Sequence, residues 1–387
     1  LIYFKMSLIY FDNAATTHTH PEVIKEMNSI LCDFYGNPSS LHSVGRSAKA
    51  KLEHARKKIC EYFSVSAQEI IFTSCGTEAD NMIINGAFNH LGIKHFITSP
   101  IEHHAVLSPL KNLKTKGYIR LDFLKINEDG LPDYVDLKRL LSNGDEKKMV
   151  SLMHVNNELG TIIDLHKVGE LCKSHNALFH SDTVQSIGHF KLNFDKIPVD
   201  FAVASAHKFH GPKGIGFIYA CKKNKLGSFI YGGEQERGMR AGTEAVHNIV
   251  GMERALEIAH KNLKKDLEYL KNLKSYCLKK INQEFPDVIY NGLSDNLFAS
   301  SHTILSIRIP MSISKAKLLS MHMDLKGVCC SRGSACQSGS DSGSHVMNEI
   351  LTEEQNQTPS IRLSFSTHNT SEEIDKLVNI LREYIDS

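Results

Sequence analysis

Short apolar runs alternate with amphipathic stretches along the first 250 residues of this chain. The apolar runs lie at 69–74, 95–100, 149–155, 177–182, 199–206 and 214–220. Apolar strands interleaved with helices are typical of βαβ units on a mostly parallel sheet. We therefore expect an α/β fold in which helices cover both faces of such a sheet.

A second region begins at a long charged stretch, residues 252–282, which is helically periodic and contains no Gly or Pro. This pattern predicts a connecting helix and a domain boundary. Two strands and a closing helix are expected beyond it, at 302–309, 360–366 and 372–385. We expect a large domain at 17–255 and a smaller α+β domain formed by 6–16 and 256–387. The doubled "LIYF" and the internal Met6 leave two origins open for residues 1–5, an upstream extension or an artificial addition, so these residues are assigned to neither domain.

Charge and composition argue against several classes of function. Lys plus Arg (45) nearly balances Asp plus Glu (43), so the net charge of +2 gives no reason to expect a nucleic acid partner. No apolar run reaches the roughly 18 residues that a membrane helix needs, and the start of the chain is too short for a signal peptide. Nine scattered cysteines without a CxxC pair favour a reducing compartment, and we expect the cytoplasm. The 21 histidines lack recognised ligand spacing, so no intrinsic metal is expected.

Polar residues gather where the predicted strands end, which is where ligands bind in sheets of this kind. Lys208 is the most unusual of them, because it follows an apolar run and precedes the glycine-rich turn "GPKGIG". A lysine there serves as a surface charge, binds phosphate or forms a Schiff base with pyridoxal phosphate. The last role needs a carboxylate for the ring nitrogen, phosphate donors and a flat group over the ring. The sequence offers candidates in Asp182, in Gly76-Thr77 at a predicted helix N-terminus, and in His103.

Each of these residues taken singly is more typical of a cap, a turn or a packed histidine. A further feature is the Ser/Gly-rich segment 331–345, which has Cys336 near its middle. Such a composition predicts a mobile loop. A lone cysteine there is by itself more typical of an incidental exposed thiol. Cys329 and Cys330 end an apolar run, and we expect them to be buried at a strand end.

The motifs together resemble the cysteine desulfurases of the NifS/IscS type, in the class V aminotransferase group of fold-type I pyridoxal-phosphate enzymes. They occur in the family's order over nearly the whole chain: "YFDNAATT", "GNPSSLH", "FTSCGTEADN", "EHHAVL", "MHVNNELGT", "HSDTVQSIG", "SAHKFHGPKGIG", "GGEQERGMRAGT", "SRGSAC" and "SIRLSFS". The resemblance implies a mostly parallel seven-stranded sheet in the large domain. Cys75 departs from the pattern, because glycine is common at that position.

The resemblance also assigns roles to individual residues. Lys208 is similar to the lysine that holds pyridoxal phosphate, and His103 to the stacking and proton-carrying histidine. Cys336 is similar to the cysteine that accepts sulfur. Asp182 is similar to the partner of the ring nitrogen, and Gln185 and Asn157 to the partners of the phenolic oxygen. The phosphate ligands of the family correspond to Gly76, Thr77, Ser205 and His207. The ligands of the substrate carboxylate correspond to Arg362 and Asn37.

Thr243 is similar to a phosphate ligand supplied by the other subunit, so the resemblance implies a homodimer. It further implies that L-cysteine yields L-alanine and a persulfide on Cys336, with the sulfur passed to an Fe–S scaffold of the NifU/IscU type. A tRNA-thiolation protein is the alternative acceptor. Cys336 would contact a partner's Fe–S cluster only transiently. Some relatives carry a tail beyond the position of Ser387 that helps dock the scaffold.

Three alternatives remain: a selenocysteine lyase or aminotransferase on the same scaffold, a non-catalytic sulfur carrier or assembly platform, and a metallo-thiol redox protein. The loop cysteine argues against an aminotransferase, which needs no nucleophilic thiol. Lys208 and Asp182 argue against a non-catalytic carrier, and the missing CxxC argues against a redox protein.

Overall fold

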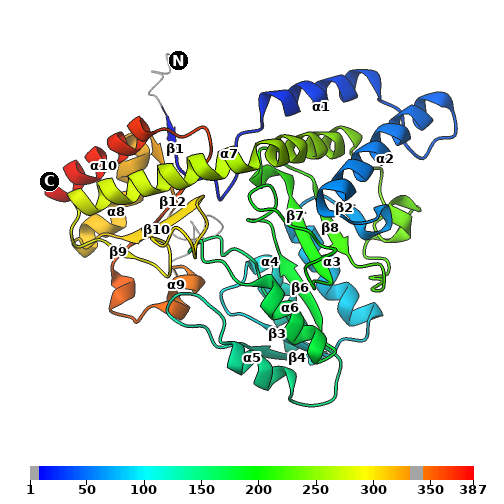
Figure 1. Cartoon of the computed structure of the whole chain (residues 1–387), viewed down its shortest axis with the longest axis horizontal. Coiled ribbons are helices and arrows are strands. Elements are labelled where there is room, and N and C mark those ends of the chain that lie inside the picture. Colours follow the sequence, from blue (N-terminus) through cyan, green and yellow to red (C-terminus); the bar gives the residue numbers. More distant parts are fainter. Residues whose placement is uncertain (1–7, 332–342) are drawn as a thin grey trace.

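The computed structural model describes residues 8–331 and 343–387, so Cys336 lies outside the described residues. Its centre is a seven-stranded sheet with the strand order β2-β8-β7-β6-β5-β3-β4 (Figure 1). β8 runs antiparallel to both of its neighbours, and the other pairs are parallel. This confirms the expected α/β fold. The strands are β2 (Ile70–Thr73), β3 (His95–Thr98), β4 (Arg120–Phe123), β5 (Lys148–Ser151), β6 (Leu178–Asp182), β7 (Phe201–Ser205) and β8 (Gly216–Ala220).

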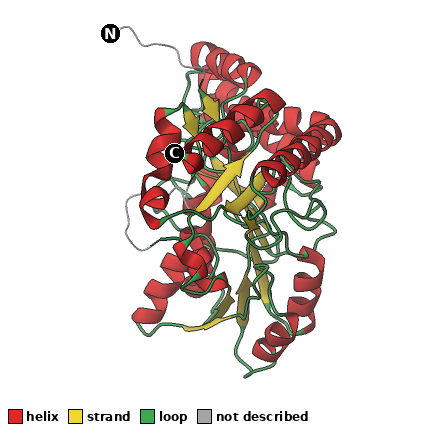
Figure 2. Cartoon of the chain, turned by 90° about the vertical axis from the view of Figure 1, so that its left-hand side faces the viewer, coloured by secondary structure: helices red, strands yellow, loops and turns green. Residues whose placement is uncertain are grey.

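Helices cover both faces of this sheet, which Figure 2 shows edge-on between them. Because side chains alternate along a strand, neighbouring residues enter different cores. Ile71 and Phe96 pack with α3 (Gly76–His90) and α4 (His104–Thr115). Ile70 and Ile97 pack on the other face. The helices on that face are α1 (Pro21–Asp33), α2 (Ser43–Phe63), α5 (Tyr134–Leu141), α6 (Leu165–Ser174) and the start of α7 (Val246–Glu284).

The long helix α7 reaches from this core to a second one (Figure 1). It confirms the helix expected at 252–282 and begins six residues earlier. Val246–Leu256 contributes side chains to the core beside the sheet, whereas Leu270–Ile281 contributes to a separate core. Among the described residues, the stretch of α7 between Leu256 and Leu270 contributes no buried side chain to either core.

The second core is built around two small sheets. β12 (Ser360–Ser364), β10 (Ile304–Arg308) and β9 (Ile289–Tyr290) pair antiparallel, and β1 (Ile9–Tyr10) pairs in parallel with β11 (Val328–Cys329). The helices there are α8 (Ile313–Leu325), α9 (His345–Ile350) and α10 (Ser371–Asp386). β10, β12 and α10 were predicted, and β11 matches the strand end expected at Cys329. β4 and the two-residue strands β1 and β9 were not predicted. The N-terminal strand thus lies against elements from the end of the chain.

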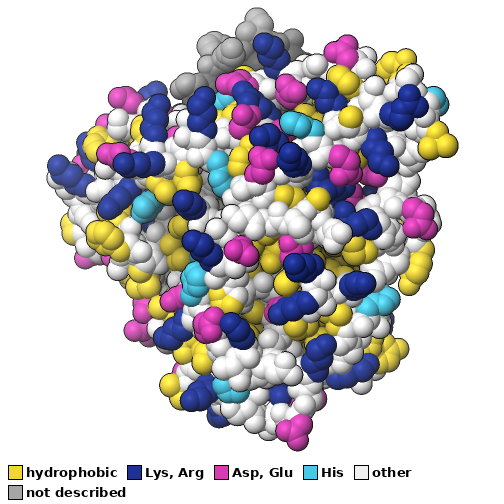
Figure 3. All heavy atoms as spheres, turned by 45° about the vertical axis from the view of Figure 1, so that its right-hand side comes forward, with side chains coloured by type: hydrophobic (Ala, Val, Ile, Leu, Met, Phe, Trp, Pro, Cys, Tyr) yellow, Lys and Arg dark blue, Asp and Glu magenta, His cyan; other side chains and the backbone are white. Residues whose placement is uncertain are grey.

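The surface carries charges of both signs. Lys and Arg side chains alternate with Asp and Glu side chains over the face in Figure 3, in line with the net charge of +2. Within residues 8–331 and 343–387, no helix is both long and apolar enough to cross a bilayer.

Candidate active site

A cavity of about 220 Å³ lies where the strands of the large sheet end. Ten of the twelve predicted site residues that the structure describes line it: Gly76, Thr77, His103, Asn157, Asp182, Gln185, Ser205, His207, Lys208 and Arg362. These residues come from six separate stretches of chain. The strand ends of the sheet bring most of them together, as expected from the position of ligand sites in such folds.

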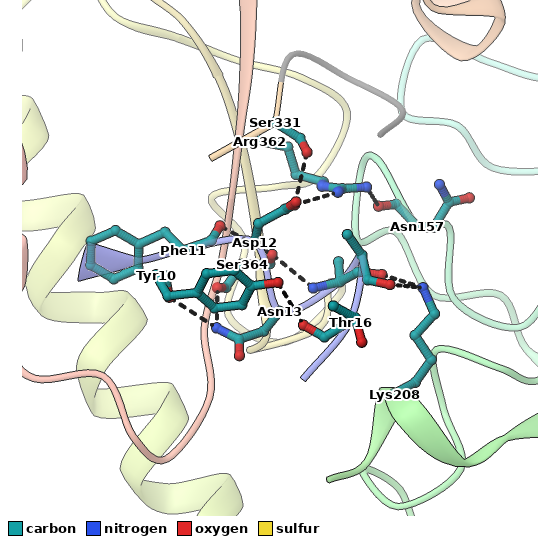
Figure 4. A network of polar contacts seen from close by, with 12 residues as sticks. Tyr10, Phe11, Asp12, Asn13, Thr16, Asn157, Lys208, Ser331, Arg362 and Ser364 are labelled. Atoms are coloured by element: carbon teal, nitrogen blue, oxygen red, sulfur yellow. Dashed lines mark hydrogen bonds and ion pairs between the residues drawn. The ribbon is translucent and has the colours of Figure 1, made fainter. Parts of the chain in front are cut away.

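Lys208 lies in the short 3₁₀ helix η2 (Ala206–Lys208), directly after β7. Its Nζ donates hydrogen bonds to the carbonyl oxygens of Ala14 and Ala15, at 2.5 and 3.0 Å (Figure 4). His189 contacts the carbonyl oxygen of Lys208 through Nε2 at 3.0 Å. The amine is therefore held at a defined place in the cavity by backbone acceptors.

Asp182 and His103 form an electrostatically coupled pair in this cavity. Asp182 ends β6, is 7% exposed and accepts a hydrogen bond from the Val184 amide at 2.9 Å. Burial raises the pKa of Asp182, while His103, the Val184 hydrogen bond and Lys208 lower it. His103 caps α4, and its Nδ1 accepts from the Ala105 amide at 3.1 Å. Burial lowers the pKa of His103, so its ring is neutral at pH 7.

The N-terminus of α3 and the end of β7 make a cradle for an anion. The first turn of α3 begins at Gly76, where backbone amides are without helical acceptors. A Cβ at Gly76 would come within 2.9 Å of Val184 Cγ2, so only glycine fits there without a shift. The Ser205 hydroxyl is buried and has no hydrogen-bond partner among the described residues. His207 Nδ1 lies 3.1 Å from Thr16 Oγ1. This donor set fits a phosphate group.

Arg362 reaches the cavity from β12 (Figure 4). It is 2% exposed, and its Nη1 donates to the Asn157 carbonyl at 2.9 Å. Nη2 donates to Asp12 Oδ1 at 2.8 Å, whereas the buried Nε has no hydrogen-bond partner within the described ranges. Gln185 Nε2 donates to the Ala14 carbonyl at 3.0 Å. The guanidinium thus retains a donor that a ligand carboxylate can use.

Two of the predicted site residues lie outside this cavity. Asn37 is exposed in the loop between α1 and α2, where its Oδ1 accepts from the Ser39 amide at 2.9 Å. The structure therefore does not bring Asn37 to Arg362. Thr243 lines a separate cavity of about 110 Å³ together with Glu236 and Arg240. In the described parts of the chain, no three His, Cys, Asp or Glu side chains are grouped as metal ligands would be.

Sequence reasoning missed several lining residues, of which Asp80 and the Ala14–Ala15 pair are the most informative. Asp80 is 1% exposed, and its Oδ1 lies 3.2 Å from His180 Nε2. Burial raises the pKa of Asp80, and the charge of Asp182 adds to the effect. Asp80 stands one helical turn after Gly76, a spacing that could have revealed it. Ala14 and Ala15 act through their carbonyls, which leave no signal in the sequence.

The other cysteines near the site have structural positions. Cys75 caps α3 and is partly buried. Cys329 ends β11, as predicted, but it and Cys330 are only partly buried rather than buried. Burial raises the pKa of Cys330 to about 12, which disfavours the thiolate that a nucleophile requires.

Comparison with known proteins agrees with this geometry. The aminotransferase class-V family model matches residues 9–377. The cysteine desulfurase IscS of Dictyoglomus turgidum is 38% identical over 380 residues, covering 98% of this chain and 94% of that protein. A solved NifS-like protein superposes with a TM-score of 0.87 at 34% identity, covering 98% and 99% of the two chains. SspA, solved in complex with cysteine, gives a TM-score of 0.79 at 28% identity, covering 94% and 100%. The chain therefore belongs to the class V aminotransferase family.

Proposed function

We propose that this protein is a cysteine desulfurase that uses pyridoxal phosphate to convert L-cysteine into L-alanine, with the sulfur transferred to Cys336 as a persulfide. The observation that carries this proposal is the meeting of Lys208, Asp182 and His103 in one cavity with the unpartnered Ser205 hydroxyl. The relatives named cysteine desulfurase, at 38% identity over nearly the full chain, support the same activity.

The residues of this cavity fit the cofactor. Lys208 would hold it covalently, and Asp182 would pair with its ring nitrogen. Gln185 and Asn157 would bond its phenolic oxygen, and its phosphate would lie in the cradle made by Gly76, Thr77, Ser205 and His207. When bound, the cofactor supplies an electron sink for the substrate's α- and β-carbons.

The chain's own groups then carry protons and sulfur. Arg362 binds the substrate carboxylate through its unpartnered Nε, which orients the amino acid. The Lys208 amine accepts the α-proton, and neutral His103 carries a second proton. The Cys336 thiolate attacks the substrate sulfur, so that a sulfur–sulfur bond forms and the carbon–sulfur bond breaks, with its electron pair going to the substrate carbon. That β-carbon then takes a proton, and the α-proton held by Lys208 returns to the α-carbon, which completes L-alanine.

We also propose that the enzyme is a homodimer in which Thr243 completes the phosphate site of the partner subunit. Its position outside the cavity of its own chain supports this role. Co-expression of Lys208→Ala and Thr243→Ala chains tests it, because a mixed dimer then contains one intact site. Recovery of cofactor binding in the mixed dimer, but in neither single variant, is expected. No recovery would show that Thr243 acts within its own chain, and full cofactor binding by the Thr243→Ala variant alone would show that it has no part in the phosphate site.

The proposal also includes the protein that accepts the sulfur from Cys336. A scaffold of the NifU/IscU type is the proposed acceptor, and the cytoplasm is the proposed location because the scattered cysteines include no CxxC pair. Purified protein carrying labelled persulfide on Cys336, mixed with a scaffold of that type, should transfer the label. A label that stays on Cys336 would exclude this acceptor.

The central test is direct. The purified protein should be yellow and, with L-cysteine and a reductant, should release sulfide and L-alanine in equal amounts. Cys336→Ser should keep the colour and lose sulfide release, whereas Cys32→Ser, at an exposed cysteine of α1, should retain both. Colourless protein would contradict the whole site. A keto acid in place of alanine would indicate an aminotransferase, and a strong preference for selenocysteine would indicate a lyase.

A further inference from the structure

Asp12 links two residues to which the proposed reaction gives separate tasks. Its Oδ1 accepts one hydrogen bond from Arg362 Nη2 and another from Ser331 Oγ, each at 2.8 Å (Figure 4). The Asp12 side chain is 19% exposed, and that of Arg362 is 2% exposed. Charge-assisted hydrogen bonds shielded from water are stronger than neutral ones. One carboxylate oxygen therefore holds a serine hydroxyl and a buried guanidinium together.

Ser331 is also tied to Arg362 through the backbone. The Arg362 amide donates to the Ser331 carbonyl at 2.8 Å, and the Ser331 amide donates to the Arg362 carbonyl at 3.3 Å. Cys336 follows Ser331 by five residues in the sequence. Ser331 is thus the last described residue before the segment that carries the sulfur acceptor, and it is anchored to the residue that would bind the substrate.

The stretch that contains Asp12 reaches the lysine as well. Ala14 and Ala15, two and three residues after Asp12, supply the carbonyls that accept from Lys208 (Figure 4). The Ser364 hydroxyl accepts from the Ala14 amide at 2.8 Å and keeps this stretch against β12. A short piece of chain therefore contacts the proposed cofactor lysine, the proposed carboxylate ligand and Ser331.

We propose that Asp12 is a positioning residue that couples the hydroxyl of Ser331 to the guanidinium of Arg362, and so to the binding of the substrate carboxylate and the sulfur transfer that follows it. This inference rests on the proposed function, since it assigns the carboxylate to Arg362 and the sulfur to Cys336. A substrate carboxylate bound to Arg362 partly neutralises the positive charge of the guanidinium. Asp12 then becomes a stronger acceptor for Ser331, so the link between Ser331 and Arg362 is strongest when substrate is present. By linkage, Ser331 in turn helps Asp12 to orient the guanidinium.

The hydroxyl of Ser331 can be tested alone. The first measurement is the rate at which persulfide appears on Cys336 in a single turnover, followed by mass spectrometry. The second is the affinity for L-alanine, followed by the cofactor's absorbance. Ser331→Ala should slow persulfide formation about tenfold, as expected for one lost hydrogen bond to a charged group, and should leave the cofactor's absorbance unchanged. Ser331→Thr, which keeps the hydroxyl, should restore most of the rate.

Ser306→Ala is the matched control. Ser306 is a buried serine directly opposite Arg362 on β10, but its hydroxyl accepts from Asn291 rather than bonding Asp12. The Ser306→Ala variant should form persulfide on Cys336 at the wild-type rate. The coupling would be refuted if Ser331→Ala formed persulfide at the wild-type rate, or if Ser306→Ala lost as much of this rate as Ser331→Ala.

The carboxylate itself should affect both measurements. Asp12→Ala should weaken L-alanine binding and slow persulfide formation, and adding Ser331→Ala to it should cause no further loss, because both changes remove one linkage. Asp12→Asn keeps the side-chain volume and serves for the same comparison if Asp12→Ala does not fold. Losses that multiply in the double variant would show that the two residues act independently. A wild-type protein that is yellow but forms no persulfide on Cys336 would instead refute the proposed function.

Discussion

At the scale of single residues, the absence of a side chain at Gly76 decides how α3 meets β6. A Cβ there would stand 2.9 Å from Val184 Cγ2. Gly76→Ala should therefore weaken cofactor binding about tenfold and destabilise the fold by about 1–2 kcal/mol, as overpacking does. Loss of the visible absorbance on dialysis measures the first effect, and urea unfolding measures the second. Gly76→Ala combined with Val184→Ala should recover both, since the second change removes the clashing methyl group. A Gly76→Ala variant with wild-type cofactor binding and wild-type stability would show that the anion cradle can accommodate a Cβ at this position.

His103 carries a prediction about pH. Burial and the nearby Lys208 lower its pKa from the ordinary 6.5, and Asp182 only partly opposes them. The ring therefore remains a neutral proton acceptor at pH 6.5, and the acidic fall in kcat/KM that it causes should lie below that value. His103→Gln should lower the rate and remove this limb of the profile. An acidic limb above pH 6.5 that disappears in His103→Gln would contradict the assignment.

At the scale of elements, a buried ion pair fixes the segment that carries Thr243. Arg56 of α2 donates to both carboxylate oxygens of Glu236, at 2.9 and 2.6 Å, and the two side chains are 3% and 2% exposed. The Phe72 amide of β2 donates to the same carboxylate at 2.9 Å. Glu236 lies in the 3₁₀ turn η3 (Gln235–Gly238) with φ of 45°. Tertiary contacts, not local propensity, therefore hold this turn.

Glu236→Gln should remove the buried partner of Arg56 and leave its charge paired only with the half-exposed Glu53. We expect it to lower the free energy of unfolding by about 3 kcal/mol, the usual cost of breaking such a pair, and to reduce cofactor retention in the dimer. Urea unfolding and absorbance after dialysis check the two effects. Glu234→Gln, at an exposed neighbour, should change stability by less than about 0.5 kcal/mol. Equal effects of the two substitutions would argue against the ion pair as the anchor.

At the scale of the whole molecule, buried neutral histidines make the fold sensitive to acid. Burial lowers the pKa of His154 to about 4 and that of His180 to about 3. Between pH 6.5 and those values the unfolded chain binds protons that the folded chain does not. The free energy of unfolding should therefore fall as the pH drops below 6.5, by up to about 1.4 kcal/mol per pH unit for each such histidine.

Urea unfolding between pH 7.5 and 5 measures this dependence. His154→Gln should flatten the slope by close to one proton, whereas His54→Gln, at an exposed position of α2, should leave it unchanged. A slope that His154→Gln does not alter would show that other groups dominate acid unfolding.

The division into two domains also belongs to this scale. Leu256, one residue past the predicted boundary at 255, packs in the core beside the sheet, whereas Ile9 and Phe11 pack in the second core. The boundary stays a prediction, because both cores draw on one continuous helix.

The sequence by itself determined six strands of the large sheet, the long helix α7 and ten of the residues that line the cavity. Short continuous apolar runs and a helical period of 3.6 are local patterns, so these strands and α7 could be predicted directly. The motifs placed Lys208, Asp182 and His103 correctly because strand ends converge at one edge of such a sheet. Only the tertiary structure decided that the carbonyls of Ala14 and Ala15 receive Lys208 and that Asp12 joins Ser331 to Arg362. Those partners lie about 190 to 350 residues apart, and packing of the two cores, which no local pattern encodes, sets their contacts.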